Sequence, residues 1–392
     1  MKRGLQEYLL PHKSPGETFH VFVPADLPPS PPLDLDSNLF DLMEKANRAL
    51  GRLDGISSIL PEISLFLYFY IRKEAVLSSQ IEGTQSSLSD LLLFESDEVP
   101  GVPLDDVQEV SNYVSALNYG IAALRNGEPI TLRLLRSIHN ELLAKGRGSD
   151  KNPGEFRQSQ NWVHGSRPGN ALYVPPPPYE VNNLMNSLAN FIHDRPDRTP
   201  ALIKAALAHV QFETIHPFLD GNGRLGRLLI TLMLCQEEAI REPLLYMSLY
   251  FRVNRDEYYR LLQKVRNEGD WEEWLAFFLT GVQTTADQAA GAAQQILKLF
   301  EADQRQIGEL GRQAGSILRV HHILQRRPLV TISEIAKQTG LTKPTIHTCL
   351  TQLEGLGIIR QRGVRIRNRV FVYEKYLEIL NEGTELKNKP SP

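Results

Sequence analysis

Apolar residues recur every three or four positions along most of the chain, the spacing that gathers them on one face of a helix. Thr131 is a residue type that caps helix N-termini, and the apolar positions that follow it are Leu132, Leu135, Ile138 and Leu142. They predict a helix over residues 130–145. Apolar and alanine-rich runs predict further helices over 65–77, 201–215 and 225–238. The chain is therefore predicted to be mainly α-helical.

The pattern changes from Ser316 onward to helix, helix, turn, helix and two β-prone segments. Residues 331–334, Thr-Ile-Ser-Glu, form a capping box that starts a short helix, and Gly340 ends this helix. The next helix opens with a proline early in its first turn, where the missing N–H costs least. This order predicts a winged helix-turn-helix, with 342–356 as the recognition helix and 362–369 as the wing.

These patterns divide the chain into five parts. The predicted parts are an irregular arm followed by helices (1–125), a helical core (126–280), a connecting helix rich in Ala, Gln and Gly (281–313), the winged helix-turn-helix (314–380) and a polar tail (381–392).

Composition is consistent with a globular protein of more than one domain. The chain has 392 residues, of which 42% are hydrophobic, and a formal net charge of −3. No apolar run is long enough to cross a membrane, and Met1 is followed by a polar segment rather than a signal peptide. The two cysteines do not have the spacing of a zinc site. We therefore expect a cytoplasmic protein that does not insert into a membrane.

The C-terminal part differs in charge from the rest of the chain. Residues 316–376 hold eleven Lys and Arg against three Glu. A basic patch of this kind can bind the phosphate backbone of DNA. The candidate contacts are Lys343, Arg362, Arg365, Arg367 and Arg369. A winged helix also serves for docking to proteins or for pairing into a homodimer, so both interpretations stay open.

The densest chemistry lies in residues 216–227, which read His-Pro-Phe-Leu-Asp-Gly-Asn-Gly-Arg-Leu-Gly-Arg and precede an apolar helix. Free backbone N–H groups at a helix start attract phosphate, and Gly221 and Gly223 let it approach closely. Arg224 and Arg227 lie three apart and can grip further phosphate oxygens. No Gly-Lys-Ser/Thr follows the glycines, so this is not a Walker A loop. The pattern predicts a nucleoside triphosphate site with a histidine base beside it.

At these residues the chain resembles the Fic family, whose signature is His-x-Phe-x-Asp/Glu-Gly-Asn-Gly-Arg-x-x-Arg. Every specified position is matched. The resemblance implies a Fic-type helical bundle with a small β-hairpin flap. It also implies transfer of AMP from ATP to a Ser, Thr or Tyr hydroxyl of a protein target, which could be the chain itself.

The resemblance implies a role for each residue of the loop. His216 would take the proton from the target hydroxyl, and Asp220 would be the ligand of Mg²⁺. The nucleotide would be held by Gly221, Asn222, Gly223, Arg224, Leu225, Gly226 and Arg227. Tyr258, Tyr259 and Asn267 are implied as parts of the adenine pocket, although the two tyrosines could equally belong to the core.

A second segment, residues 78–83, matches the family's inhibitory pattern Ser/Thr-x-x-x-Glu-Gly/Asn with Ser78, Glu82 and Gly83. The pattern follows a predicted helix that Gly83 can terminate. A carboxylate that pairs with Arg227 would compete with the γ-phosphate of ATP. We therefore expect an enzyme held shut by a helix N-terminal to the core. A solvated glutamate at a helix end is the plainer alternative.

Two β-prone runs flank the turn at 165–169 and predict a hairpin. The resemblance implies that this hairpin is the flap that pairs with an extended segment of the target, with Trp162, Val163, Leu172 and Tyr173 as docking residues. Two other functions stay open for the whole chain. One is removal of AMP from a modified protein, with Glu82 positioning the water, and the other is a DNA-binding regulator that senses ATP.

Overall fold

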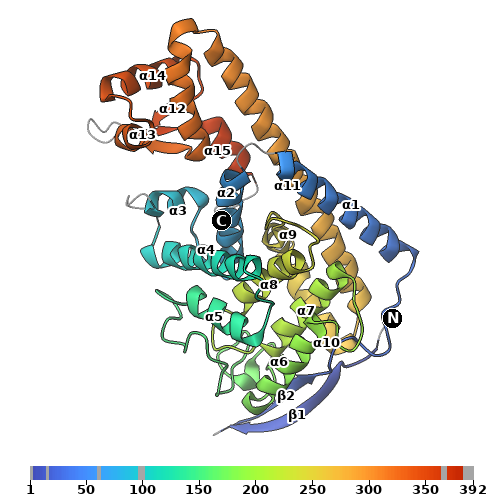
Figure 1. The fold of residues 1–392 in the computed structure, drawn as a ribbon. Coiled ribbons are helices and arrows are strands. Elements are labelled where there is room, and N and C mark those ends of the chain that lie inside the picture. The colour runs from blue at the N-terminus through green and yellow to red at the C-terminus, as the bar shows by residue number, and fades with distance from the viewer. Residues whose placement is uncertain (1–2, 15–16, 60–62, 96–101, 363–368, 383–392) are drawn as a thin grey trace, which may run out of the picture. The chain divides into compact units, whose positions relative to one another are not determined.

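The structure is a computed structural model that describes residues 3–14, 17–59, 63–95, 102–362 and 369–382 (Figure 1). It is mainly helical, as predicted, and the described residues contain two small antiparallel sheets. The chain forms two compact units, one made of residues 1–54 and 74–287 and the other of 55–73 and 288–392. Helices α1 (Ser37–Ile59), α2 (Ile63–Ile81) and α11 (Trp271–Gly308) contribute residues to both.

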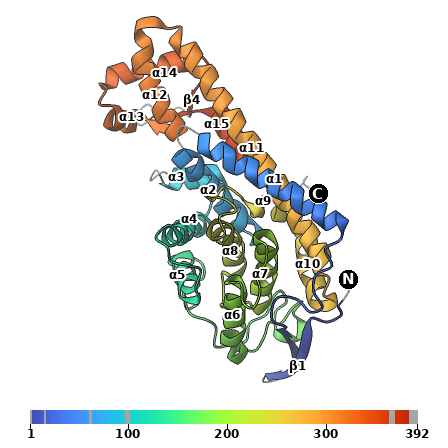
Figure 2. The same ribbon diagram turned by 45° about the vertical axis from the view of Figure 1, so that its right-hand side comes forward.

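A helical bundle forms the center of the first unit. Its helices are α4 (Leu104–Arg125), α5 (Leu132–Leu142), α6 (Pro178–Ile192), α7 (Ala201–Ile215) and α8 (Asn222–Gln236). Helix α8 contacts α4, α5 and α7, and α6, α7 and α8 lie side by side in Figures 1 and 2. Both α7 and α8 are buried over almost their whole length, which explains why their sequences lack a polar face.

Local signals in the sequence account for where these helices begin. Thr131 caps α5 as predicted, since its side chain accepts a hydrogen bond from the N–H of Leu134. Helix α2 is longer than the predicted run of 65–77, and Gly83 follows its end with a φ of 103°. Three further helices of the unit are α3 (Leu88–Glu95), α9 (Met247–Val253) and α10 (Arg255–Glu268).

The prediction of an irregular N-terminal arm is wrong. Strands β1 (Glu7–Ser14) and β2 (Glu17–Pro24) form an antiparallel hairpin. Phe19 and Val21 of β2 are buried against Val174, and the N–H of Phe22 donates to the C=O of Val174 at 3.0 Å. The hairpin is therefore stabilised by a contact distant in sequence, which local periodicity in a proline-rich stretch did not reveal.

Helix α11 also differs from the expected connecting helix. It begins at Trp271, ten residues before the predicted start, and ends at Gly308. The buried indole of Trp274 donates to the C=O of Ala206 on α7 at 3.0 Å, so the first turns of α11 belong to the bundle core. The expected boundary after residue 280 thus lies inside a continuous helix.

The second unit contains the predicted helix-turn-helix. Its elements after α11 are α12 (Ala314–Arg326), β3 (Leu329–Thr331), α13 (Ile332–Thr339), α14 (Lys343–Gly355), β4 (Arg360–Arg362), β5 (Val370–Val372) and α15 (Glu374–Asn381). The capping box of Thr331 and Glu334 is present, and Gly340 ends α13 in a left-handed conformation. The sheet order is β3-β5-β4, so β3 is a strand that the sequence pattern did not predict.

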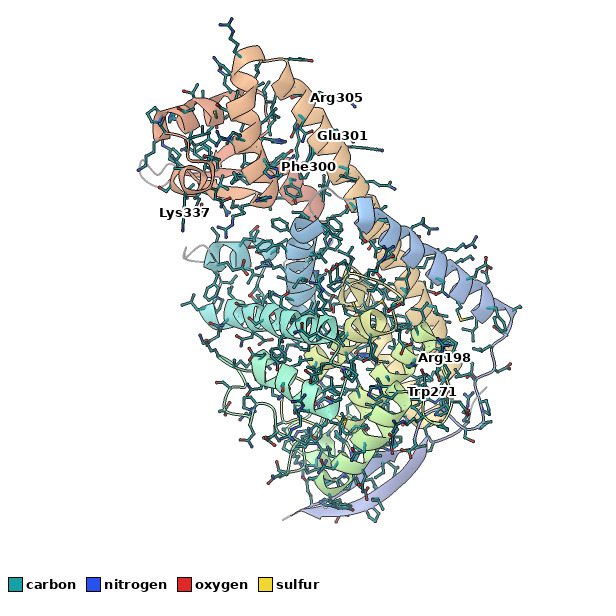
Figure 3. The ribbon with its side chains drawn as sticks, in the orientation of Figure 1. Arg198, Trp271, Phe300, Glu301, Arg305 and Lys337 are labelled. Carbon is teal, nitrogen blue, oxygen red and sulfur yellow. The ribbon has the colours of Figure 1, made fainter. Side chains whose placement is uncertain are left out.

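Aromatic residues fill the core of this second unit. Phe300 of α11 (Figure 3) packs against His321, Tyr373 and Tyr376, and Tyr376 meets Phe69 of α2 edge to face. The buried hydroxyl of Tyr373 donates to Asp303 of α11. These contacts fix the C-terminal half of α11 and the first half of α2 within the winged-helix unit.

Most of the expected wing and tail lie outside the described residues, namely 363–368 and 383–392, including Arg365 and Arg367. Lys343 and Arg362 are exposed, and Arg369 is half-buried. No helix in the described part of the chain combines the length and the apolar character needed to cross a bilayer.

Candidate active site

The loop from His216 to Gly221 connects α7 to α8. His216 ends α7 in a left-handed conformation, with φ 50° and ψ 59°, and its N–H donates to the C=O of Phe212 at 2.9 Å. Such a φ is uncommon for a residue other than glycine. Gly221, with a φ of 76°, precedes the first turn of α8. The two left-handed residues turn the chain sharply between two buried helices.

The side chain of Asn222 stabilises this loop through two hydrogen bonds. Its Oδ1 accepts from the N–H of Phe218 and its Nδ2 donates to the C=O of Phe218, both at 2.9 Å. The residue is 2% exposed. Asn222 is among the residues expected to hold the nucleotide, but both polar atoms of its side chain already bond the backbone of Phe218.

The imidazole of His216 is held as a neutral base. Burial lowers the pKa of His216 from 6.5 to about 4, with a further contribution from the positive charge of Arg157. Nδ1 lies 3.4 Å from the C=O of Glu213, so a proton on Nδ1 would leave Nε2 free to accept one. A neutral imidazole with a free ring nitrogen can serve as a general base at neutral pH.

Asp220 presents a carboxylate at the other end of the loop. Its Oδ1 accepts from the N–H of Gly221 at 2.6 Å and lies 3.5 Å from Arg224 Nη2. The side chain is 29% exposed. A partly exposed carboxylate next to a helix start suits one ligand position of a Mg²⁺ whose other ligands are phosphates and water. Among the described residues, no three His, Cys, Asp or Glu side chains are grouped to hold a metal by themselves.

Arg224 is buried and paired with an acid that sequence reasoning missed. Its Nη1 lies 3.1 Å from Oε1 of Glu109 on α4, and both side chains are 3% exposed. Burial raises the pKa of Glu109, although Arg224 opposes the shift. Nothing in the local sequence of α4 distinguishes Glu109 from a solvated helix residue, because the pair forms across 115 positions.

Arg227 meets the 78–83 segment. Its Nε donates to Ser78 Oγ at 2.9 Å, and its Nη2 donates to the Ser78 C=O at 3.0 Å and to Glu82 Oε1 at 2.7 Å. Burial favours a higher pKa for Glu82, but the charge and hydrogen bond of Arg227 outweigh it and lower this pKa. The structure therefore brings Glu82 and Arg227 into the expected ion pair and adds two contacts between Ser78 and Arg227 that sequence analysis did not anticipate.

Glu82 also lies against the start of α8. A Cβ added to Gly223 would stand 2.3 Å from Glu82 Oε1 and 3.0 Å from Arg227 Nη1. The carboxylate thus occupies the space that the missing side chain of Gly223 leaves open, at a helix N-terminus suited to anions. One acidic group fills the position where a phosphate would be expected.

A buried polar cluster lies behind Ser78. Glu74, one turn earlier on α2, accepts hydrogen bonds from Tyr113 of α4 at 3.2 Å and from Ser248 of α9. Burial raises the pKa of Glu74 to about 7. The cluster fixes α2 against two neighbouring helices, and sequence analysis did not identify it.

The predicted flap is present, but one isolated bridge replaces the two strands of a regular hairpin. Val163 and Tyr173 make an isolated antiparallel bridge, and a short 3₁₀ turn (Pro168–Asn170) lies between them. Trp162 and Leu172 are exposed, with 39% and 63% of their surfaces accessible. Tyr173 is buried, and its hydroxyl donates to the C=O of Thr214 at 2.7 Å. Of the four expected docking residues, two point to solvent and one anchors the flap to α7.

The three residues expected in the adenine pocket lie in different environments. Tyr258 is buried, with its hydroxyl 2.9 Å from His209 Nε2. Tyr259 is half-buried, and burial raises its pKa, with a further increase from the charge of Glu82 that Arg227 opposes. Asn267 is exposed near the end of α10 and lines a pocket with β2 and the flap.

Comparison with known proteins agrees with this geometry. Residues 40–122 match the family described as Fic/DOC family N-terminal, residues 129–234 match Fic/DOC family, and residues 321–363 match IclR helix-turn-helix domain. A protein adenylyltransferase Fic from Aedes aegypti is 30% identical over 266 residues, which cover 67% of this chain and 50% of that protein. The same-named protein from Culex quinquefasciatus is 29% identical over 295 residues, 72% of this chain and 55% of that protein. The chain spans about half the length of these curated relatives.

Solved structures show the same fold. A Fic family protein from Desulfovibrio desulfuricans G20 superimposes with a TM-score of 0.58 at 20% identity, covering 88% of this chain and 98% of that one. Fic-1 (aa134–508) from C. elegans gives 0.51 at 22% identity, covering 66% and 73%. The N-terminal and central family domains, the complete motif and the fold all agree, and the chain therefore belongs to the Fic/DOC family.

Proposed function

We propose that the protein transfers AMP from ATP to the hydroxyl of a Ser, Thr or Tyr side chain of a protein, itself included, and releases pyrophosphate. The observation that carries the proposal is the arrangement around one loop. A neutral imidazole at His216, a carboxylate at Asp220 and the guanidinium of Arg227 surround the start of α8. The names of the curated relatives support the same reaction.

The reaction needs one proton acceptor. His216 takes the proton of the target hydroxyl while the hydroxyl oxygen attacks the α-phosphorus of ATP. The bond from the α-phosphorus to the oxygen that bridges the α- and β-phosphates breaks, and pyrophosphate leaves. The low pKa of His216 keeps the imidazole unprotonated at neutral pH. Because the backbone fixes His216 at the end of a buried helix, the base is positioned before substrate binds.

The phosphates require positive charge and free N–H groups. The start of α8 and Arg227 supply both, with Arg224 beside them. Mg²⁺ bound through Asp220 would neutralise charge on the phosphates. Asn222 contributes by keeping the loop in shape through its two bonds to Phe218.

We further propose that the described conformation is the inhibited state. Glu82 occupies two of the features that a triphosphate needs, the Nη2 donor of Arg227 and the space at Gly223. The Glu82 carboxylate and the γ-phosphate of ATP are both negatively charged and would repel each other at one edge of the Arg227 guanidinium. Bound Glu82 therefore disfavours the productive position of the γ-phosphate.

Labelled ATP tests the proposed function. Purified wild type, Glu82→Gly and His216→Ala are incubated with ATP carrying the label on the α-phosphate, with Mg²⁺, and the protein-bound label is measured. We expect the strongest label in Glu82→Gly, less in wild type and none in His216→Ala. A parallel sample with the label on the γ-phosphate should stay unlabelled in all three.

Other outcomes would point to the alternatives. Absence of α-label in every variant, with ATP still bound, would contradict AMP transfer and favour ATP sensing. If a previously labelled protein loses its label in the presence of wild type but not of Glu82→Gly, removal of AMP would be favoured instead.

A second role, DNA contact, has support from the C-terminal unit. Residues 321–363 match a helix-turn-helix family, and the exposed positions of α14 include Lys343, His347, Thr348 and Thr351. These side chains can donate to or accept from phosphates and base edges. We propose DNA as a partner of this unit, separate from the chemistry at His216.

A further inference from the structure

The segment that leads into the flap also holds the catalytic loop from outside. Residues 154–161 run along the end of α7, and their polar groups bond the carbonyl oxygens of residues 215–218. The motif itself supplies none of these donors. We call residues 154–161 the clasp segment.

Arg157 makes most of these contacts. Its Nε donates to the C=O of His216 at 2.9 Å, and its Nη2 donates to Pro176 at 2.5 Å and Ile215 at 3.4 Å. Its Nη1 reaches the C=O of Ser159 at 3.4 Å, and its own N–H donates to Pro217 at 2.9 Å. The side chain is 3% exposed. One guanidinium thus joins the base of the flap to the backbone of the catalytic histidine.

This arginine is unusual in its choice of partners. Among the described residues, no carboxylate forms an ion pair with Arg157, and its charge is balanced by carbonyl oxygens at the C-terminal end of α7. A buried cation without a counter-charge is costly unless its donors are satisfied. The arrangement therefore favours one backbone conformation, the one that directs these carbonyls toward the guanidinium.

Asn161 adds a second, uncharged contact from the clasp segment. Its Nδ2 donates to the C=O of Phe218 at 2.9 Å and lies 3.4 Å from the C=O of His216. Together the two side chains bond the loop on both sides of Pro217. His216 keeps its left-handed backbone between them.

We propose that Arg157 is a positioning residue for AMP transfer, which holds His216 in its left-handed conformation and couples the flap to the catalytic imidazole. The inference rests on the proposed function, and it assigns to a residue outside the motif the task of aiming the base. Arg157 bonds the backbone of His216 and takes no proton itself.

The charge of Arg157 gives a signature that a merely structural residue would lack. The charged groups that act on His216 are Arg157, Arg266 of α10 and Glu82 of α2. The two arginines lower the pKa of His216 and Glu82 raises it. Removing Arg157 should therefore raise this pKa, while removing the neutral Asn161 should not.

The experiment uses full-length Glu82→Gly protein with four changes added singly: Arg157→Met, Arg157→Lys, Asn161→Leu and Arg136→Met. Arg136→Met is the matched control, because Arg136 bonds Gly154 and Glu155 of the same segment but not His216. NMR of labelled histidine follows the titration of His216, assigned by its absence in His216→Ala. Self-labelling with α-labelled ATP gives kcat and the KM for ATP.

We expect Arg157→Met to raise the titration midpoint of His216 and to lower kcat by about tenfold or more, with little change in KM. Arg157→Lys should keep the titration midpoint of His216 low but still lower kcat, because an ammonium cannot bond all the carbonyl oxygens that the planar guanidinium reaches. Asn161→Leu should lower kcat without moving the midpoint, and Arg136→Met should change neither.

The proposal is overturned if Arg157→Met folds and leaves both the midpoint and kcat unchanged, or raises KM alone. If Arg157→Met does not fold, Arg157→Lys decides by the same kcat criterion. If the parent protein shows no AMP transfer at all, the proposed function fails. The NMR titration still tests whether Arg157 acts on His216 in that case.

Discussion

Under the proposed function, Arg227 is the residue at which ATP binding and inhibition compete. It is 1% exposed, so it has no solvent to satisfy its donors, and Ser78 and Glu82 provide the acceptors in this conformation. A triphosphate would have to replace Glu82 at the same edge. Exchange of one anion for another at a buried guanidinium is a sensitive control point, because an unpaired charge there is strongly disfavoured.

The pH dependence of activity should report His216. Because its pKa is lowered to about 4, the base stays neutral as pH falls through the range in which an ordinary histidine protonates. In Glu82→Gly the pKa should be lower still, since Glu82 raises it. We expect the self-labelling rate to be nearly constant between about pH 5.5 and 8. A rate that falls by half near pH 6.5 would contradict the low pKa.

The buried carboxyl of Glu213 should make the free energy of unfolding depend on pH. Burial raises its pKa from 4.5 to about 7, and its Oε1 has no hydrogen-bond partner among the described residues. A raised pKa stabilises the fold at low pH, and this contribution is lost as pH rises from about 4.5 through 7. Glu213→Gln should therefore be more stable than wild type at about pH 8, by on the order of 1–3 kcal/mol, and should lose this advantage near pH 5.

Urea unfolding of the two proteins at both pH values measures the difference. The exposed Glu301→Gln, on α11, is the control and should show no pH-dependent gain. An equal effect of Glu213→Gln at the two pH values would mean that Glu213 is not the titrating group.

Among the helices, the proposed function assigns the regulation to α2 and α8 and the base to the end of α7. The sequence predicted all three helices from apolar periodicity, and it predicted their functional ends from glycines and the motif. It could not predict Glu109, Glu74 or Arg157 as partners, because each of them acts across a long sequence separation on a neighbouring helix or loop. The hairpin β1–β2 was missed for the same reason, since its burial depends on Val174.

Ser78 tests how the end of α2 is anchored. Ser78→Ala removes the acceptor of Arg227 Nε while leaving the bond to Glu82. We expect partial relief, with self-labelling above wild type but below Glu82→Gly, and a loss of stability of about 1–2 kcal/mol because a buried donor is left unsatisfied.

Ser79→Ala is the matched control for this change. Ser79 is equally buried, and its hydroxyl has no hydrogen-bond partner within the described residues. It should leave both labelling and stability close to wild type. Identical effects of the two substitutions would mean that the contact of Ser78 with Arg227 does not matter.

The whole chain combines a Fic/DOC unit with a winged-helix unit. The sequence distinguished the two by charge and by the change of pattern near residue 316. It placed their boundary less well, because α11 runs without interruption from Trp271 to Gly308 and carries core residues of both. No break in helical periodicity marks the change of unit there.

DNA binding by the second unit should depend on salt and not on the catalytic loop. We expect Lys343→Ala to weaken binding to duplex DNA and to reduce the slope of log affinity against log salt by about one. Lys375→Ala, on α15 outside the helix-turn-helix, serves as the control. Binding that is unaffected by both salt and Lys343→Ala would argue against phosphate contacts by α14.

The proposed function requires that His216 catalyses AMP transfer and that Glu82 restrains it. Intact-protein mass spectrometry can test both roles in Glu82→Gly and in the double variant Glu82→Gly/His216→Ala after incubation with ATP and Mg²⁺. We expect a mass gain of one AMP group in the single variant, larger in extent than in wild type, and no gain in the double variant. A gain that persists without His216, or that is no greater in Glu82→Gly than in wild type, would contradict it.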